Sequence, residues 1–182
     1  MAIRELESTS ANWLAQQVAW LQTQPALLHH GYTLRPATRA DRDAILVLER
    51  YCFSPWLAFG RRHWHEQLRR QSRRVWLVLD GDQVLAYMAL LPHGGWQQVS
   101  VTALAVHWQH RGQGLGALLL SLAELEARAR GLGRIRLEVD CDNDAALRLY
   151  QRHGYVALCS IPDYYGVGRP GVRLEKRLPE MI

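Results

Sequence analysis

Lysine, cysteine and phenylalanine are scarce in this chain of 182 residues. Lys176 is the only lysine, so 21 of the 22 basic residues are arginine, and there are two phenylalanines. The three cysteines, Cys52, Cys141 and Cys159, are odd in number and include no C-x-x-C pair. This pattern argues against a disulfide framework or a zinc ribbon, and it favours a reducing compartment, which we expect to be the cytoplasm.

Long apolar runs are also missing. No stretch reaches the roughly 18 uninterrupted apolar residues that a membrane span needs. The N-terminal segment carries Glu5 and Glu7 where a signal peptide would have an apolar core. We therefore expect no membrane partner. With 48% apolar and 21% charged residues, the composition is that of a globular domain.

The net charge of +5 is local rather than general. Residues 61–74 contain six arginines and one glutamate, and the cations and anions of the remaining chain cancel. We expect this segment to be a solvated helix face or a place for acceptor or partner selection. Because the rest of the chain is neutral overall, we do not expect nucleic acid as a partner.

The residue pattern predicts a helical extension over residues 1–30 and one domain over residues 31–182. Within the domain, alternation and apolar runs predict strands at 32–35, 75–79, 83–91, 97–106, 134–139, 156–161 and 172–178. Helical spacing predicts a helix after the Thr38-x-x-Asp41 capping box, a second from Ser54-Pro55, and others at 115–130 and 144–152. This order indicates an α/β or α+β fold with a mixed sheet.

The most informative segment joins the strand at 97–106 to the helix at 115–130. Residues 111–116 read Arg-Gly-Gln-Gly-Leu-Gly. Glycines at the start of a helix let successive backbone N–H groups approach a ligand where the helix dipole is positive, which is an arrangement that binds phosphate. A tight strand-to-helix turn without a ligand is the simpler alternative.

Three glycine codes can be compared with this segment. The P-loop code fails because no lysine follows, and the dinucleotide code G-x-G-x-x-G has Ala117 at its third glycine position. The code R/Q-x-x-G-x-G/A is matched in full by Arg111–Gly116. That code is the coenzyme A pyrophosphate loop of the GCN5-related N-acetyltransferases (GNAT superfamily), and further motifs of that family stand in the right order. Residues 104–106 resemble the end of the family's strand before the loop, and residues 143–150 resemble its N-x-x-A-x-x-L-Y helix. Gly154-Tyr155 resembles the Gly-aromatic pair that follows this helix.

The resemblance covers about residues 31–178. It implies a central mixed, mostly antiparallel, twisted sheet of six to seven strands flanked by about four helices. It also implies that acetyl-CoA is the cosubstrate. Trp108 stands where the family commonly has proline. The residues that would hold the donor are Leu104, Ala105, Val106, Arg111, Gly112, Gln113, Gly114, Leu115, Gly116, Ala117 and Asn143.

Within the family, the chain is similar to the bacterial ribosomal-protein alanine N-acetyltransferases. That likeness implies that Glu138 is the general base and Tyr150 the general acid. It also implies that Phe53 and Trp56, with the Tyr164-Tyr165 pair, contact the acceptor, which would be a peptide N-terminus such as that of a ribosomal protein. The tail at residues 166–174 and the first 30 residues depart from that branch.

Several alternatives stay open. The acceptor can be a small-molecule amine or amino acid instead of a peptide. The chain can also be a non-catalytic acyl-CoA-binding module that binds RNA or protein through residues 61–74. On spacing alone, Glu138 reads as a surface residue paired with Arg134 or Arg136, and Asn143 as a helix cap. The histidine pairs lack the spacing of ligands, so we expect no metal. The oligomeric state, monomer or homodimer, is open.

Overall fold

The computed structural model describes residues 27–29, 31–70 and 73–179. The predicted helix of the N-terminal extension lies outside these residues. The last part of that extension is a strand, β1 (Leu27–His29), which pairs with β2 (Tyr32–Pro36). The sequence analysis did not predict β1. It adds an edge strand to the sheet.

The strands of the described residues form one mixed sheet of eight strands in the order β1-β2-β3-β4-β5-β6-β8-β7. The remaining strands are β3 (Arg74–Asp80), β4 (Gln83–His93), β5 (Gln98–Val106), β6 (Arg134–Asp140), β7 (Val156–Ile161) and β8 (Gly171–Arg177). All neighbours are antiparallel except β5 and β6. The predicted mixed, mostly antiparallel fold is confirmed.

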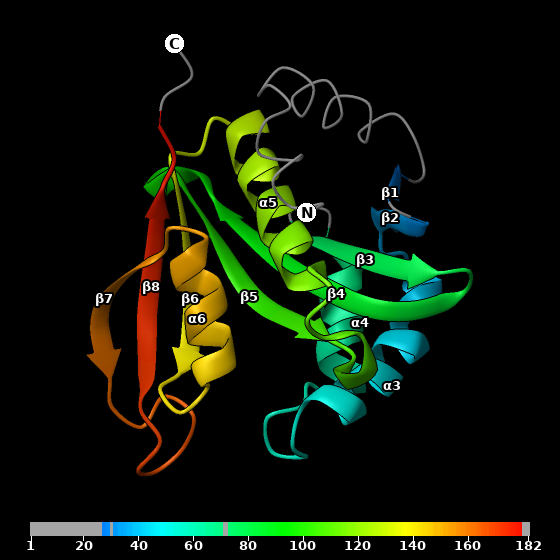
Figure 1. Ribbon diagram of the computed structural model, residues 1–182, viewed down its shortest axis with the longest axis horizontal. Helices are drawn as coiled ribbons and strands as arrows, with labels where there is room; N and C mark the ends of the chain where they lie inside the picture. The colour runs from blue at the N-terminus through cyan, green and yellow to red at the C-terminus, as the bar shows by residue number, and fades with distance from the viewer. Residues whose placement is uncertain (1–26, 30, 71–72, 180–182) are drawn as a thin grey trace.

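Four α-helices in the described ranges cover the two faces of the sheet. The helix α5 (Leu115–Ala129) packs with α6 (Asp144–Arg152) on one face, and α3 (Arg42–Cys52) packs with α4 (Arg61–Arg69) on the other (Figure 1). None of the helices that the structure describes is long and apolar enough to cross a membrane.

The central strands are buried on both faces, which explains their continuous apolar runs. On β3, Trp76 and Val78 join the core under α5, whereas Val75, Leu77 and Leu79 join the core under α3 and α4. The second core contains Trp64, whose side chain is fully buried against the ring of Tyr87. The sheet is therefore a rigid support for the loops at its ends.

The second helix does not begin at Ser54-Pro55, so that prediction is wrong. Residues 53–60 form turns, in which the N–H groups of Leu57 and Ala58 both donate to the carbonyl of Ser54. The chain is extended at Gly60, and α4 begins at Arg61. A proline near a helix start favours a turn as well as a first helical turn, and here the turn prevails.

The parallel pair β5–β6 is paired along only part of its length. The register runs from Gln98 opposite Arg134 to Val101 opposite Leu137, although β5 continues to Val106 and β6 to Asp140. Figure 1 shows the two strands diverging beyond this point. A register shift against β4 places an extra residue, Thr102, in β5, and such bulges redirect the side chains that follow. Val101 therefore joins the α5 core, while Ala103 and Ala105 face α3 and α4.

Candidate active site

The glycine-rich turn lies directly after the diverging end of β5. Gly112 and Gly114 have φ angles of 77° and 85°, in the left-handed region that favours glycine. Gly114 is the N-cap of α5, and its carbonyl accepts from the N–H of Leu118. The N–H groups at the start of α5, including those of Leu115 and Gly116, have no partner within the helix. N–H groups in this position can hold an anion, and binding of the donor at this turn stays a prediction.

Side chains from elsewhere in the fold fix this turn. The hydroxyl of Tyr32 on β2 donates to Gln113 Oε1 at 2.9 Å. Arg111 Nε donates to the carbonyl of Val106 at 3.2 Å, and the Cys52 thiol contacts the same carbonyl at 3.4 Å. Gly116 is packed so closely that an added Cβ would lie 2.9 Å from Leu149 Cδ2. The turn is therefore held at the end of β5 before any ligand binds.

Glu138 lies on β6 just beyond the last residue paired with β5. Its carboxylate forms an ion pair with Arg173 of β8, with 2.8 Å between Oε1 and Nε. The other oxygen accepts from the Tyr164 hydroxyl at 3.5 Å. The side chain of Glu138 is 20% exposed, so it remains open to solvent or a substrate. The alternative pairing with Arg134 or Arg136 does not occur, because Arg173 is its neighbour across β6 and β8.

The loop between β7 and β8 is tied to this end of β6. The Tyr165 hydroxyl donates to the carbonyl of Glu138 at 3.0 Å. Arg169 forms an ion pair with Asp140, and the N–H of Cys141 donates to the carbonyl of Pro170 at 3.2 Å. The tail that departs from the family branch thus holds the Tyr164-Tyr165 pair against Glu138.

Tyr150 is buried in α6, with 7% of its surface exposed. Burial raises the pKa of Tyr150 to about 12, which keeps its hydroxyl protonated at neutral pH. Its ring meets Tyr155 edge-on at 5.9 Å. Burial is also the main reason why the pKa of Tyr165 is raised. Tyr165 lies near enough to interact electrostatically with both Tyr150 and Glu138. Tyr165 is therefore a neighbour of both the predicted acid and the predicted base.

The other predicted residues take several positions. Asn143 is the N-cap of α6, and its Oδ1 accepts from the N–H of Ala146 at 3.2 Å. Phe53 packs against the core under α3, whereas Trp56 is 73% exposed. Within the described ranges, neither Phe53 nor Trp56 makes a hydrogen bond or ring contact with Glu138. The structure therefore brings together Glu138, Tyr164 and Tyr165, and it leaves Phe53 and Trp56 on the separate segment 53–60.

One group of possible metal ligands adjoins this site. Asp140, Cys141 and Asp142 place one ligand atom each within 4.8 Å of one another. The carboxylate of Asp140 already pairs with Arg169 and accepts from the N–H of Asp142. These contacts fix the turn in which β6 ends, and they account for the positions of the three residues.

Glu49, which no sequence pattern singled out, holds segment 53–60 from beneath. Glu49 is 1% exposed. It accepts from the Tyr87 hydroxyl and, at 2.8 Å, from the N–H of Phe59. Tyr87 pairs with Ala105 of β5, so this carboxylate connects the segment to the strand that diverges from β6. In a sequence, a glutamate in a helix indicates a surface residue. The structural role of Glu49 is seen only from its burial in the fold.

The model of the acetyltransferase (GNAT) family matches residues 42–155, which is more than half of the chain. The chain belongs to this family. No curated protein matches it in sequence.

Solved structures agree on the fold. The ribosomal-protein-S18-alanine N-acetyltransferase of Escherichia coli is 18% identical, with a TM-score of 0.74 over 83% of this chain and 96% of that chain. An aminoglycoside 6'-N-acetyltransferase complexed with coenzyme A is 18% identical, with a TM-score of 0.71 over 82% of this chain and 99% of that chain.

The spermidine/spermine N-acetyltransferase SpeG of Vibrio cholerae, solved with manganese ions, is 18% identical. Its TM-score is 0.66 over 81% of this chain and 92% of that chain. Such identities show the fold and leave the acceptor open. Family and fold together make the protein an acyltransferase, of a family that uses acetyl-CoA.

The burial of Glu49 predicts a pH-dependent contribution to stability. Burial raises the pKa of Glu49, and this effect exceeds the lowering of the pKa by the hydrogen bonds from Tyr87 and Phe59. A carboxyl group with a raised folded pKa contributes stability below its unfolded pKa, and that contribution is lost as the pH rises through the folded value. Glutamine does not titrate. We expect the free energy of unfolding of the wild type, relative to Glu49→Gln, to fall between pH 4 and pH 8 in urea titrations. A difference that stays constant with pH would contradict this.

Proposed function

We propose that this protein transfers the acetyl group of acetyl-CoA directly to the N-terminal amine of a peptide or protein. The observation that carries the acceptor class is the pairing of both carboxylates at the end of β6, Glu138 with Arg173 and Asp140 with Arg169. An acceptor with several ammonium groups, such as a polyamine, needs several free carboxylates. A peptide N-terminus brings one amine.

The donor would be held by the turn at Gly112–Ala117. Its pyrophosphate suits the free N–H groups at the start of α5 and the nearby Arg111 guanidinium. The backbone of Leu104–Val106 has no β6 neighbour, so it is available to pair with the extended arm of the donor. The same backbone offers N–H groups that can stabilise the oxyanion as the thioester is attacked.

Proton transfer is assigned to two residues. Glu138 takes a proton from the acceptor ammonium, directly or through water, so that the amine can attack the thioester carbon. The new N–C bond turns the thioester carbonyl into an oxyanion, and the C–S bond breaks as the carbonyl re-forms. Tyr150 keeps its proton through burial and donates it to the departing thiolate. The second proton that the nitrogen loses in forming the amide returns to the Tyr150 oxygen, directly or through water. Arg173, which the sequence analysis did not identify, positions the Glu138 carboxylate.

The acceptor class is tested by a panel of substrates. The assay follows thiol release from acetyl-CoA, with mass spectrometry of the products. The panel contains peptides that vary in their first residue, the same peptides with formylated N-termini and an internal lysine, spermidine and an aminoglycoside. We expect acetylation of free α-amines and none of the blocked peptides. Turnover of the small amines with no peptide acetylated would overturn the proposed acceptor.

The catalytic roles predict large losses in rate. Glu138→Gln and Tyr150→Phe should each lower kcat by about 10²–10⁴-fold, which is the usual contribution of a general acid or base. Acetyl-CoA affinity should be unchanged, as measured by calorimetry.

Two matched variants serve as controls. Glu124→Gln removes a carboxylate of α5 that pairs with Lys176 of β8. Tyr155→Phe removes a buried hydroxyl that has no hydrogen-bond partner in the described residues. Both should keep normal kcat. Normal turnover by both Glu138→Gln and Tyr150→Phe would show that the two roles are assigned wrongly.

The donor site predicts a selective effect of glycine substitution. Gly112 and Gly131 both have positive φ and open space around an added Cβ, so alanine at either position carries a similar strain. We expect only Gly112→Ala to weaken coenzyme A binding, by about tenfold, because it disturbs the N–H groups of the turn. Calorimetry measures the affinity. Equal affinities for the two variants would contradict the proposal that coenzyme A binds at this turn.

A further inference from the structure

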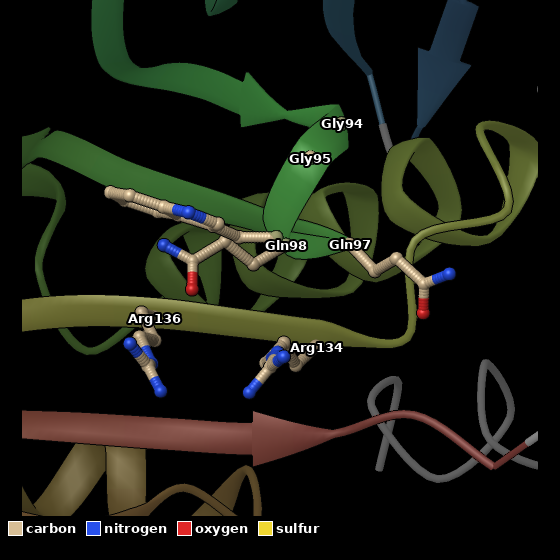
Figure 2. Close-up of a pocket in the computed structure, with 7 residues that line it drawn as sticks. Gly94, Gly95, Gln97, Gln98, Arg134 and Arg136 are labelled. Atoms are coloured by element: carbon tan, nitrogen blue, oxygen red, sulfur yellow. The ribbon is translucent and has the colours of Figure 1, made fainter.

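A pocket lies at the opposite end of β5 from the glycine turn. It has a volume of about 450 Å³ and is lined by Gly94–Gln98, Arg134 and Arg136. Figure 2 shows the side chains of Arg134 and Arg136 projecting from β6 to the same side, with Gln98 beside them and Gln97 pointing away. The wall formed by Gly94–Trp96 is a 3-10 turn that closes the β4–β5 hairpin.

Positive charge is concentrated around this pocket. Arg134 lies opposite Arg177 in the β6–β8 pairing, and it forms no ion pair with any described residue. Among the described residues, Glu175 is the one carboxylate that pairs with this cluster, with Arg136 at 2.6 Å and with Arg177 at 3.5 Å. One carboxylate thus faces three guanidinium groups, so the cluster carries a net positive charge.

The pocket also presents an exposed aromatic face. Trp96 is 65% exposed, although large apolar side chains usually avoid water. The His93 ring stacks on it, with centroids 5.3 Å apart and planes at 24°. The backbone of Gln97 is left-handed at φ 48°, which completes the tight turn that displays Trp96. A stacked aromatic pair of this kind is a platform for a planar ring.

This pocket is distinct from the donor site. Gln98 begins β5 and Val106 ends it, so the pocket and the glycine turn are separated by about 26 Å along the strand. No residue that lines the pocket was assigned to acetyl transfer. A ligand here therefore does not have to be acetyl-CoA or the acceptor amine.

We propose that this pocket binds a nucleotide unit of single-stranded RNA. Guanidinium groups bind phosphate and an exposed indole stacks on a base, which are the two elements that single-strand sites combine. An acidic peptide would use the arginines and leave the Trp96 face without a partner. The row of cations continues past the pocket to Arg177 on β8, which suits the next phosphate of a strand better than a single nucleotide.

The test measures binding of the full-length protein to a fluorescein-labelled oligouridine by fluorescence anisotropy across a salt series. Trp96→Ala should weaken binding by about tenfold, as expected for loss of one stacked base. The double variant Arg134→Gln/Arg177→Gln should weaken binding and reduce the slope of log affinity against log salt by about 1.4, since each single-strand phosphate contact contributes about 0.7. Thermal melting confirms that the variants are folded.

Matched controls locate the site. Arg62→Gln/Arg69→Gln removes two charges from α4, and Trp56→Ala removes another exposed indole. Both should leave RNA affinity within about twofold. Coenzyme A and double-stranded RNA should not displace the probe. The proposal is overturned if the probe does not bind, if coenzyme A displaces it, if uridine monophosphate competes as well per site as the strand, or if the α4 variant loses more affinity than the pocket variants.

Discussion

The partial pairing of β5 with β6 is the constraint on which the rest of the site depends. The two strands share a register only from Gln98 to Val101 on β5, and each continues for several residues beyond it. Backbone N–H and C=O groups need partners, so the free side of β5 is a place for water or a ligand. The bulge at Thr102 turns the side chains that follow, so that Ala103 and Ala105 face the helices α3 and α4.

The charges around the diverging strands are nearly balanced in ion pairs. Glu138 and Asp140 are each held by an arginine that comes from β8 or its preceding loop. Each pair positions a carboxylate and also removes a free negative charge from the site. Segment 53–60 is in turn held by the buried Glu49. The candidate site is thus built from groups whose partners lie far away in the sequence.

Local sequence patterns predicted much of this fold. The strands from β2 onward and the helices α5 and α6 follow from periodicity. The turn at Gly112 and Gly114 follows from glycine spacing, because positive φ angles favour glycine. Segment 53–60 could not be predicted, because Ser54-Pro55 suits both a turn and a helix start. Arg173 and Glu49 were missed for a different reason. Their roles depend on the β6–β8 register and on burial, which a single sequence does not contain. The same holds for the cluster of Arg134 and Arg177, since net charge by segment does not show which strands are neighbours.

The central claim is that coenzyme A occupies the space where β5 leaves β6. Backbone amide shifts, recorded by ¹⁵N-resolved NMR while coenzyme A is added, test it most directly. The account predicts the largest shifts at residues 104–106 and 111–117, with little change at Gly94–Gln98. Shifts centred on Trp96 and Arg134, or none at residues 104–106 and 111–117 at saturating ligand, would contradict it.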